Sequence, residues 1–473
     1  MSGYFNFEAI DNSLSKKKTE KGISSHDIGE VKFSFPFTSH TTKVFSEGIN
    51  EVIGELVRLT NNLDDPEITY DGDYTYSDYP LINNVIENVK FPGDQHQEKL
   101  SKFLEEYLFK GSQELKPLHL YLFNYIEVNK DKNEKIKYAR FIYDFLFYPN
   151  PEISSIFSSK DTDNLLTELI ISSLKDLETR KKSKQIDGTK YSNTLPLLSE
   201  LFVEDFMYLS KHKDYFINHF FNMIHFYIFQ YLLQFLKKAQ KFGEEQDLYY
   251  MEPFHFTFDW ETGVGGYRDA VEDYKFIKNN ANNLFVHVHC MSHISHNEAF
   301  YNAGHELKNY TRVINELSHL STEERLMEKE KLYNWVKKYS ELIQEDLPES
   351  FNENMEFTEM FKVLFNQLQK GMSMGVRKKY GSNIDSIGKE RFLKARGKHG
   401  FILSLKQEDF LMLSAVAVKD KKIPLKEFFN QLEVRGVAFD QYSKKEAVKL
   451  LDQQNYIEKK SDSGDAQYVK PIL

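Results

Sequence analysis

Apolar residues recur at helical spacing along most of the chain, and they predict a mainly α-helical protein. Such patterns cover residues 45–63, 95–111, 135–149, 161–178, 197–242 and 269–297. A charged helix is expected from residue 322, because Ser321 and Glu324 have the spacing of a capping box. Glycine (22) and proline (12) are scarce among the 473 residues, which favours helices over a many-stranded sandwich.

The last part of the chain has a more specific pattern. Residues 407–420 and 423–436 predict two short helices, the second with Pro424 in its first turn and Gly436 as its stop. Residues 443–455 predict a third helix, with Ser443 and Glu446 in capping-box spacing. Two apolar segments around the turn 461–465 read as a β-hairpin. Three helices followed by a hairpin is the order of a winged-helix module, in which the third helix is the recognition helix and the hairpin is the wing.

Shifts in composition divide the chain into five predicted segments. They are a mobile polar arm (1–35), an N-terminal helical domain (36–193), a central helical domain (194–370), a basic Gly-containing connector (371–405) and the winged-helix domain (406–473). Residues 220–236 carry no acidic or basic side chain apart from His225, but they are fewer than the ~20 residues that a membrane span needs. A buried core helix is therefore predicted, and no membrane partner.

Cysteine usage bears on the compartment. Cys290 is the only cysteine, so an intrachain disulfide is excluded and a reducing compartment is favoured. The N-terminal residues have no apolar run of signal-peptide length. A cytoplasmic location is expected.

Charge is distributed unevenly. The net charge is −10, yet residues 371–473 hold 20 Lys and Arg against 13 Asp and Glu, while the rest of the chain holds 41 against 58. An anionic partner would therefore meet the C-terminal region. Lysines of the third helix fall opposite its apolar stripe, other lysines lie on the wing, and the glycines of the connector would permit close approach to phosphates. The candidate DNA-binding residues are Arg377, Lys378, Lys379, Lys389, Arg391, Lys394, Arg396, Lys398, Lys445, Lys449, Lys459 and Lys460.

The same surfaces also carry acidic residues. Asp452, Asp462 and Asp465 would repel phosphate, and the third helix offers no Arg or Asn well placed to read bases. Many winged helices dock proteins, so a protein-binding role for this module stays open.

Recognisable catalytic motifs are absent. His289, His293 and His296 share a helical face beside Cys290, but no glutamate completes an H-E-x-x-H motif, and histidines in such helices usually bond to backbone or carboxylate partners. The glycines at 263, 265 and 266 fail the G-x-G-x-x-G spacing, and no P-loop occurs. We therefore expect no catalytic residue, metal or cofactor. A metal-dependent nuclease built on the histidines between His287 and His296 is a third, weaker hypothesis.

Residues 392–418 (FLKARGKHGFILSLKQEDFLMLSAVAV) and 432–473, which end in SDSGDAQYVKPIL, resemble the C-terminal end of the DptG family. The resemblance covers roughly the last 80 residues; upstream only the size and the helical, aromatic-rich character are similar. It implies a subunit of a bacterial restriction system that depends on DNA phosphorothioation. Such a subunit works with an ATPase and a second partner against invading DNA that lacks the sulfur modification. The family supplies no catalytic residues to carry over.

Two functional hypotheses therefore rank above the nuclease. The leading hypothesis is a non-catalytic subunit of a prokaryotic anti-phage restriction complex, whose acidic body docks partner proteins and whose basic connector and winged helix help to hold double-stranded DNA. The alternative is a pure protein–protein adaptor that makes no DNA contact of its own.

Overall fold

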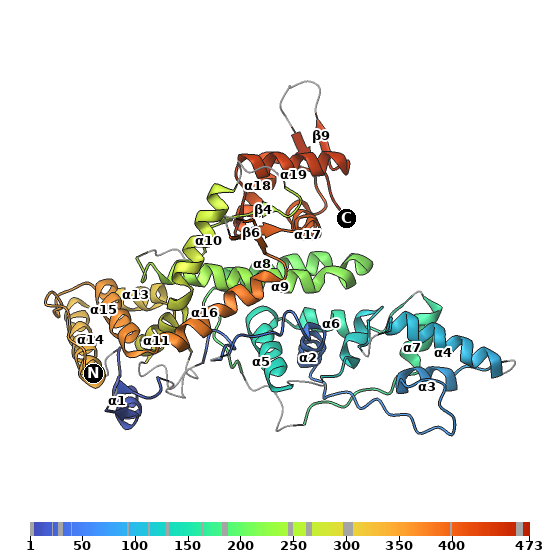
Figure 1. Ribbon diagram of the computed structural model, residues 1–473, viewed down its shortest axis with the longest axis horizontal. Helices are drawn as coiled ribbons and strands as arrows, with labels where there is room; N and C mark the ends of the chain where they lie inside the picture. Colours follow the sequence, from blue (N-terminus) through green and yellow to red (C-terminus); the bar gives the residue numbers. More distant parts are fainter. Residues whose placement is uncertain are drawn as a thin grey trace. The chain divides into compact units, whose positions relative to one another are not determined.

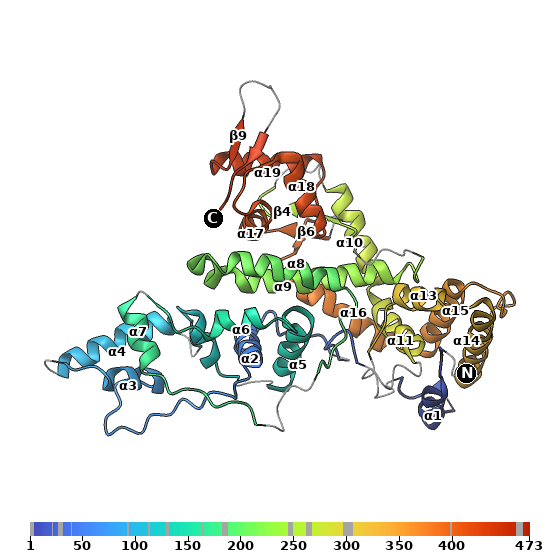
Figure 2. The same cartoon turned by 180° about the vertical axis from the view of Figure 1, so that it is seen from behind.

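The computed structural model is mainly helical, as the apolar spacing predicts, and its strands are only two to five residues long (Figures 1 and 2). It describes residues 4–20, 22–26, 32–38, 40–91, 94–111, 114–128, 132–162, 164–181, 188–244, 249–261, 267–296, 306–397, 400–459 and 467–473. The chain forms two compact units. The larger contains Met1–Lys43, Lys190–Asp205 and Asn222–Leu473, and the smaller contains Val44–Thr189 and Phe206–Phe221.

The smaller unit is built around helix α2, which packs on α5, α6 and η1. Arg58 of α2 is fully buried; it donates to the backbone oxygens of Asn124 (3.2 Å) and Ile126 (2.5 Å) and pairs with Glu55 (3.0 Å). The main helices of this unit are α2 (Ile49–Asn61), α3 (Pro80–Glu87), α4 (Asp94–Leu108), η1 (Leu120–Tyr125), α5 (Lys132–Ile142), η2 (Tyr143–Phe147), α6 (Pro151–Ser158) and α7 (Leu165–Ser172).

The larger unit has a helical body. Within it α14 packs on α15, and α11 packs on both α15 and α16. The helices that contribute to it are α1 (Glu8–Lys16), α8 (Pro196–Leu209), α9 (Lys213–Ala239), α10 (Arg268–Asn280), η5 (Ala281–Asn283), α11 (Leu284–Ser295), α13 (Tyr310–Ser318), α14 (Thr322–Ile343), α15 (Phe357–Gly371) and α16 (Met374–Lys389). The capping box predicted at Ser321 and Glu324 is confirmed at the start of α14.

Helix α9 is a core helix, as predicted for residues 220–236. Its polar side chains find partners inside the unit: His225 Nε2 lies 2.8 Å from the backbone oxygen of Ile387, and Gln234 donates to that of Glu252 (2.8 Å). None of the helices described is both long and apolar enough to cross a membrane.

Part of the expected N-terminal arm is helical and packed. In α1 the side chains of Ile10 and Leu14 are fully buried, and the helix contacts α14. Phe7 stacks on Trp335 with 5.3 Å between ring centroids, and the Phe5 amide donates to Glu328 (2.7 Å). The amphipathic pattern of residues 8–16 is short, and for that reason it was not distinguished from a polar arm.

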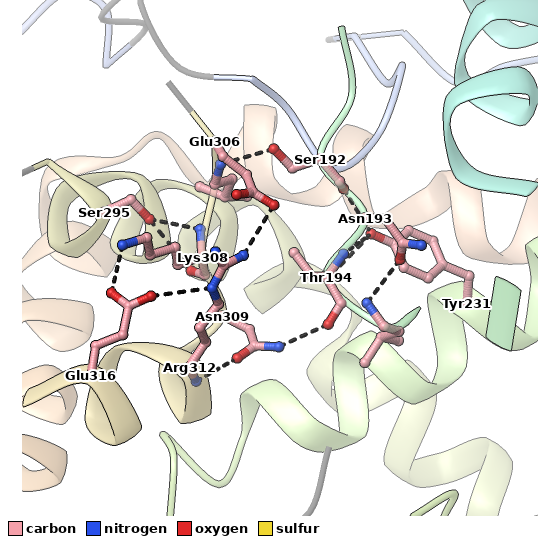
Figure 3. A network of polar contacts seen from close by, with 12 residues as sticks. Ser192, Asn193, Thr194, Tyr231, Ser295, Glu306, Lys308, Asn309, Arg312 and Glu316 are labelled. Atoms are coloured by element: carbon pink, nitrogen blue, oxygen red, sulfur yellow. Dashed lines mark hydrogen bonds and ion pairs between the residues drawn. The ribbon is translucent and has the colours of Figure 1, made fainter. Parts of the chain in front are cut away.

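A network of polar contacts joins residues 192–194 to residues 306–316 (Figure 3). The Leu307 amide donates to Ser192 Oγ (2.8 Å), and Asn309 Nδ2 donates to the Thr194 oxygen (2.8 Å). Lys308 pairs with Glu316 at 2.5 Å in the same network (Figure 3). Residues 192–194, which precede α8 in the chain, are therefore fixed to the helical body of their own unit.

The C-terminal part of the larger unit contains α17 (Gln407–Val418), α18 (Leu425–Val434) and α19 (Gln441–Gln453), followed by an antiparallel pair of strands, β9 (Ile457–Lys459) and β10 (Gln467–Val469). The predicted order of three helices and two strands is thus present. Residues 460–466, which include the predicted turn 461–465, lie outside the described residues. Gly436 follows α18 with a φ of 82°, as expected of a helix stop.

Three small sheets pack with these helices. We call helices α17–α19 and the three sheets the C-terminal module. Strand β7 (Ile423–Pro424) pairs with β10, so the order of the first sheet is β7-β10-β9. Residues far upstream form the others: β3 (Phe254–His255) runs parallel to β8 (Val437–Ala438), and β4 (Thr257–Phe258) runs parallel to β6 (Phe401–Leu405), which also pairs with β5 (Leu393–Ala395). Residues 254–258 are therefore part of the module, although almost 150 residues separate them from their partners in β6.

Candidate nucleic-acid interface

The glycines of the basic connector serve contacts within the protein. Residues 374–389 of the predicted connector form helix α16. A Cβ atom added at Gly381 would lie 2.4 Å from the Ala281 oxygen, and one at Gly388 would lie 2.8 Å from the Phe229 ring. Because α16 packs so closely on η5 and α9, the backbone at these two glycines cannot approach a phosphate chain. The expectation that they would do so is wrong.

Two of the predicted DNA-binding arginines are committed to internal contacts. Arg377 is buried and donates to the backbone oxygens of Gln369 (3.1 Å) and Asn282 (3.4 Å); its burial lowers the pKa of the guanidinium. Arg391 binds the fully buried Asp409 (2.8 Å) and also pairs with Glu408. Neither side chain is available to a phosphate.

Two further connector residues hold the segment that enters the module. Lys394 Nζ donates to the Asp259 oxygen (2.5 Å), and Arg396 donates to the Phe258 oxygen (2.7 Å). The Arg396 guanidinium also lies over the Tyr267 ring, 5.0 Å from its centroid. These two half-buried cations therefore stabilise the end of β4, and their role as DNA contacts stays a prediction.

Three connector lysines remain on the surface. Lys378 and Lys379 are exposed on α16, and Lys389 is exposed at its end, where the ammonium lies 5.3 Å from the centroid of the Phe401 ring. Lys378 and Lys389 are eleven residues apart, which places them on the same side of the helix about 16 Å apart. Lys398 lies outside the described residues.

Helix α19 begins before the predicted capping box. Its N-cap is Asp440, whose Oδ1 accepts from the Ser443 amide (2.7 Å). Ser443 is fully buried and donates to Glu261 Oε2 (3.0 Å), a residue of the segment that follows β4. The prediction that Ser443 caps this helix is therefore wrong, because Asp440 offers the same side-chain acceptor one turn earlier.

The lysines of α19 and the wing face solvent as predicted, but acidic neighbours accompany them. Lys445 and Lys449 are exposed, and Lys449 Nζ lies 3.6 Å from Glu446. Lys459 Nζ lies 3.4 Å from Asp452, the residue expected to repel phosphate. Lys460 falls outside the described residues. This surface is of mixed charge rather than uniformly basic.

A shallow groove lies between α18, α19 and β10, with a volume of about 470 Å³. The apolar side chains that line it are Leu425 and Phe429 of α18 and Val448 of α19, and Lys444, Lys445 and Lys449 border it. Asp452 and Gln467 complete the lining. The sequence contained a signal for this groove that was not used: Val448 lies on the lysine side of α19, outside the apolar stripe of Ala447, Leu450 and Leu451.

A buried ion pair anchors the module and was also not predicted. Arg435, at the end of α18, binds both carboxylate oxygens of Asp205 in α8 (2.7 and 2.6 Å), and the side chains of both residues are almost completely buried. Tyr227 Oη of α9 donates to the same carboxylate (2.6 Å). Sequence separation of 230 residues hides such a pair from any local pattern.

His287 and His293 of α11 contact neighbouring side chains. His287 contacts Tyr310 Oη (3.0 Å) and Gln240 (2.9 Å), and Trp335 Nε1 donates to His293 Nδ1 (3.3 Å). Burial lowers the pKa of His287 and of His289 to about 3. Within the described residues no group of three or more His, Cys, Asp or Glu side chains is arranged to hold a metal ion.

Comparison of the chain with models of protein families and with curated proteins gives no match. The functional interpretation therefore depends on the residues and surfaces described above.

Proposed function

We propose that this chain is a non-catalytic subunit of a DNA phosphorothioation-dependent restriction complex of the anti-phage type, which docks an ATPase and other subunits of that complex and helps to hold double-stranded DNA. The resemblance of residues 392–418 and 432–473 to the DptG family motivates this assignment. The observation that carries the docking role is the lysine-bordered apolar groove on the C-terminal module. An apolar depression at a surface is typical of a protein-binding site.

The order of elements in the module supports its interpretation as a winged helix. The short strand β7 lies between α17 and α18 and joins the terminal strands in the sheet β7-β10-β9. Helix α19, the third helix, keeps one face toward the core through Ala447 and Leu451 and turns Lys445 and Lys449 outward. This is the arrangement expected of a recognition helix next to a wing.

The DNA-holding role rests on the lysines that remain exposed. These are Lys378, Lys379 and Lys389 on α16, and Lys445, Lys449 and Lys459 on the module. Fluorescence anisotropy with a labelled duplex of about 30 base pairs, titrated between about 50 and 200 mM salt, measures their contribution. The Lys378→Gln/Lys379→Gln variant should bind more weakly and should reduce the slope of log K against log salt by about 1 for each lost phosphate contact. Binding that is independent of salt, or unchanged in all six Lys→Gln variants, would remove DNA from the proposal.

Point substitutions are needed because a deletion of residues 371–473 would disrupt the core of the larger unit. It would remove α16 from α11 and η5, and the partners of β3 and β4 as well. Loss of binding after such a deletion would not distinguish a lost interface from a lost fold.

A pure adaptor without DNA contact is the second candidate, and one observation favours it. Four of the eight connector cations, Arg377, Arg391, Lys394 and Arg396, are engaged inside the protein. The two candidates differ in what the exposed lysines do. Under the adaptor hypothesis, Lys445→Gln/Lys449→Gln reduces co-purification with the ATPase subunit, while no lysine variant alters DNA binding by the assembled complex.

A further inference from the structure

The groove between α18 and α19 has a shape that can accommodate a helix of another protein. On α18, Leu425 and Phe429 are four residues apart; on α19, Lys444, Val448 and Asp452 repeat at the same spacing. Residues four apart form a ridge along a helix, and the valley between two such ridges accepts the side chains of another helix. Leu425 and Val448 are only partly buried, so the apolar floor is open to a ligand.

The border of the groove favours acidic residues in that ligand. Lys445 and Lys449 are exposed, and the Lys444 ammonium lies over the Phe429 ring, 5.2 Å from its centroid. Lys444 and Lys449 each have a glutamate partner at 3.6 Å, but their side chains are 38% and 62% exposed, and exposed pairs of this kind contribute little stability. A carboxylate on a bound partner can therefore replace Glu433 or Glu446 as the neighbour of these lysines at small cost.

The same features disfavour DNA as the occupant of the groove. When a helix fills the groove, the DNA-holding role falls to the exposed lysines of α16 and to Lys459. Leu425, Phe429 and Val448 offer no donor to a phosphate oxygen, and Asp452 lies in the lining. Glu433 and Glu446, the partners of the bordering lysines, also lie next to the groove. Phosphate binding uses clustered donors and few acids. An apolar floor with lysines along one side suits a helix with apolar residues on one face and acidic residues beside them.

We propose that this groove binds an acidic amphipathic helix of a protein partner. The inference deepens the proposed docking function and rests on it, because it specifies the surface and the chemical character of the partner. From Lys444 to Asp452 the groove follows about 12 Å of α19, so two to three turns of a partner helix fill it. Apolar side chains at i, i+3 or i+4, and i+7 would contact Leu425, Phe429 and Val448, with Asp or Glu beside Lys445 and Lys449.

The test uses the full chain and a phage-displayed library of random peptides of about 16 residues, enough for about four helical turns. The library is selected on the wild-type chain after depletion on the Val448→Asp variant. Val448 is half-buried on the surface of α19, so an aspartate there introduces a charge into the groove without entering the core. We expect enriched peptides to carry Asp or Glu together with apolar residues at helical spacing.

Synthetic versions of the enriched peptides are then measured by fluorescence anisotropy. Affinity should fall at least about tenfold for Val448→Asp and for Lys444→Gln/Lys445→Gln/Lys449→Gln, because a tenfold change corresponds to the loss of about one good contact. The Lys337→Gln/Lys338→Gln variant is the matched control, since it removes the same kind of exposed charge from α14. Circular dichroism and thermal unfolding confirm that each variant is folded.

Three results would overturn the inference. They are failure to enrich any peptide over the depleted library, enrichment of basic or purely apolar peptides, and protection of α18 and α19 from hydrogen exchange by a 30-base-pair duplex but not by peptide. A separate result distinguishes the docking function from the groove. If assembly with the ATPase subunit is lost in the Lys378→Gln/Lys379→Gln variant but not in Val448→Asp, the chain docks a partner through a surface other than the groove.

Discussion

Replacing Arg435 alone is expected to lower the stability of the larger unit by about 3–5 kcal/mol, because the substitution leaves the carboxylate of Asp205 buried without its counter-ion. The Asp205 side chain is 0% exposed and that of Arg435 is 2% exposed, so water cannot take the place of the missing partner. Two bonds of 2.7 and 2.6 Å join the pair. At about 4 Å and an effective dielectric constant of 20, two unit charges attract by about 4 kcal/mol, which agrees with that range.

A double-mutant cycle isolates the pair. Arg435→Met and Asp205→Asn should each be strongly destabilising, whereas the double variant should be more stable than the sum of the two losses predicts by about 2 kcal/mol or more. Tyr227 keeps a partner in the Asn variant, since its hydroxyl can still donate to the amide oxygen. The control is Lys444→Met, which breaks the exposed pair with Glu433 and should cost at most about 1 kcal/mol.

The two tryptophans of the chain make the assay local. Trp260 stacks on Phe258 in the C-terminal module, and Trp335 lies on α14 in the helical body. Urea unfolding followed by fluorescence in Trp335→Phe and Trp260→Phe backgrounds therefore reports the module and the body separately. Arg435→Met should lower the urea midpoint of the transition that Trp260 reports at least as much as the midpoint that Trp335 reports. An additive cycle, or a loss below about 1 kcal/mol for Arg435→Met, would refute the view that a buried charge pair anchors the module.

Three other predictions follow from the buried groups. The histidines His26, His225, His287 and His289 are buried with pKa values lowered from 6.5 to between about 3 and 4, chiefly by desolvation, so the stability that they provide is complete above pH 6.5 and is lost as the pH falls. At pH 5 each of these histidines should lower the free energy of unfolding by about 2 kcal/mol. The melting temperature should therefore fall steeply between pH 6.5 and 5, and an unchanged melting temperature would contradict this prediction. Burial raises the pKa of Asp409 to about 6 despite the neighbouring Arg391, so its effect on stability has the opposite pH dependence. As the pH falls from 7 to 4.5, the free energy of unfolding of the wild type should rise by about 2 kcal/mol relative to Asp409→Asn, measured by urea unfolding of both proteins. Gly381→Ala should destabilise the protein by about 1–3 kcal/mol, because the added Cβ would lie 2.4 Å from the Ala281 oxygen. Gly375→Ala in the same helix, where the Cβ would lie 3.6 Å from Ser373 Oγ, should be neutral or slightly stabilising. Equal effects of the two substitutions in chemical denaturation would show that α16 does not pack closely on η5.

Local patterns sufficed for some of the helices, among them the two longest, α9 and α14. Helix α9 was predictable because an apolar run with a few polar residues has few alternatives to a buried helix, and α14 was predictable because Ser321 and Glu324 form a cap through neighbouring backbone atoms. The start of α19 was predicted three residues late. Asp440 and Ser443 are both good caps, and the choice depends on Glu261, which binds Ser443 from 182 residues away.

The candidate interface was less predictable, because a count of charges does not identify their partners. Lys378 and Lys394 look alike in the sequence, yet one is exposed and the other donates to the Asp259 oxygen. That contact exists only because residues 254–258 pair with strands of the C-terminal module. Strands of two residues leave no periodicity to detect, so the sequence could not show which connector cations would be used inside the fold.

The pairing of β4 with β6 also has a consequence for the synthesis of the protein in the cell. Thr257 emerges from the ribosome 147 residues before its partner Ser404. At about 5–20 residues per second, the strand waits about 7–30 s before its pairing edge can be covered. During that time Phe258, which is fully buried in the finished fold, lacks its later partners Phe410 and Phe439. The nascent chain should therefore be most dependent on chaperones, and most prone to aggregate, in the interval between the translation of codons 258 and 404.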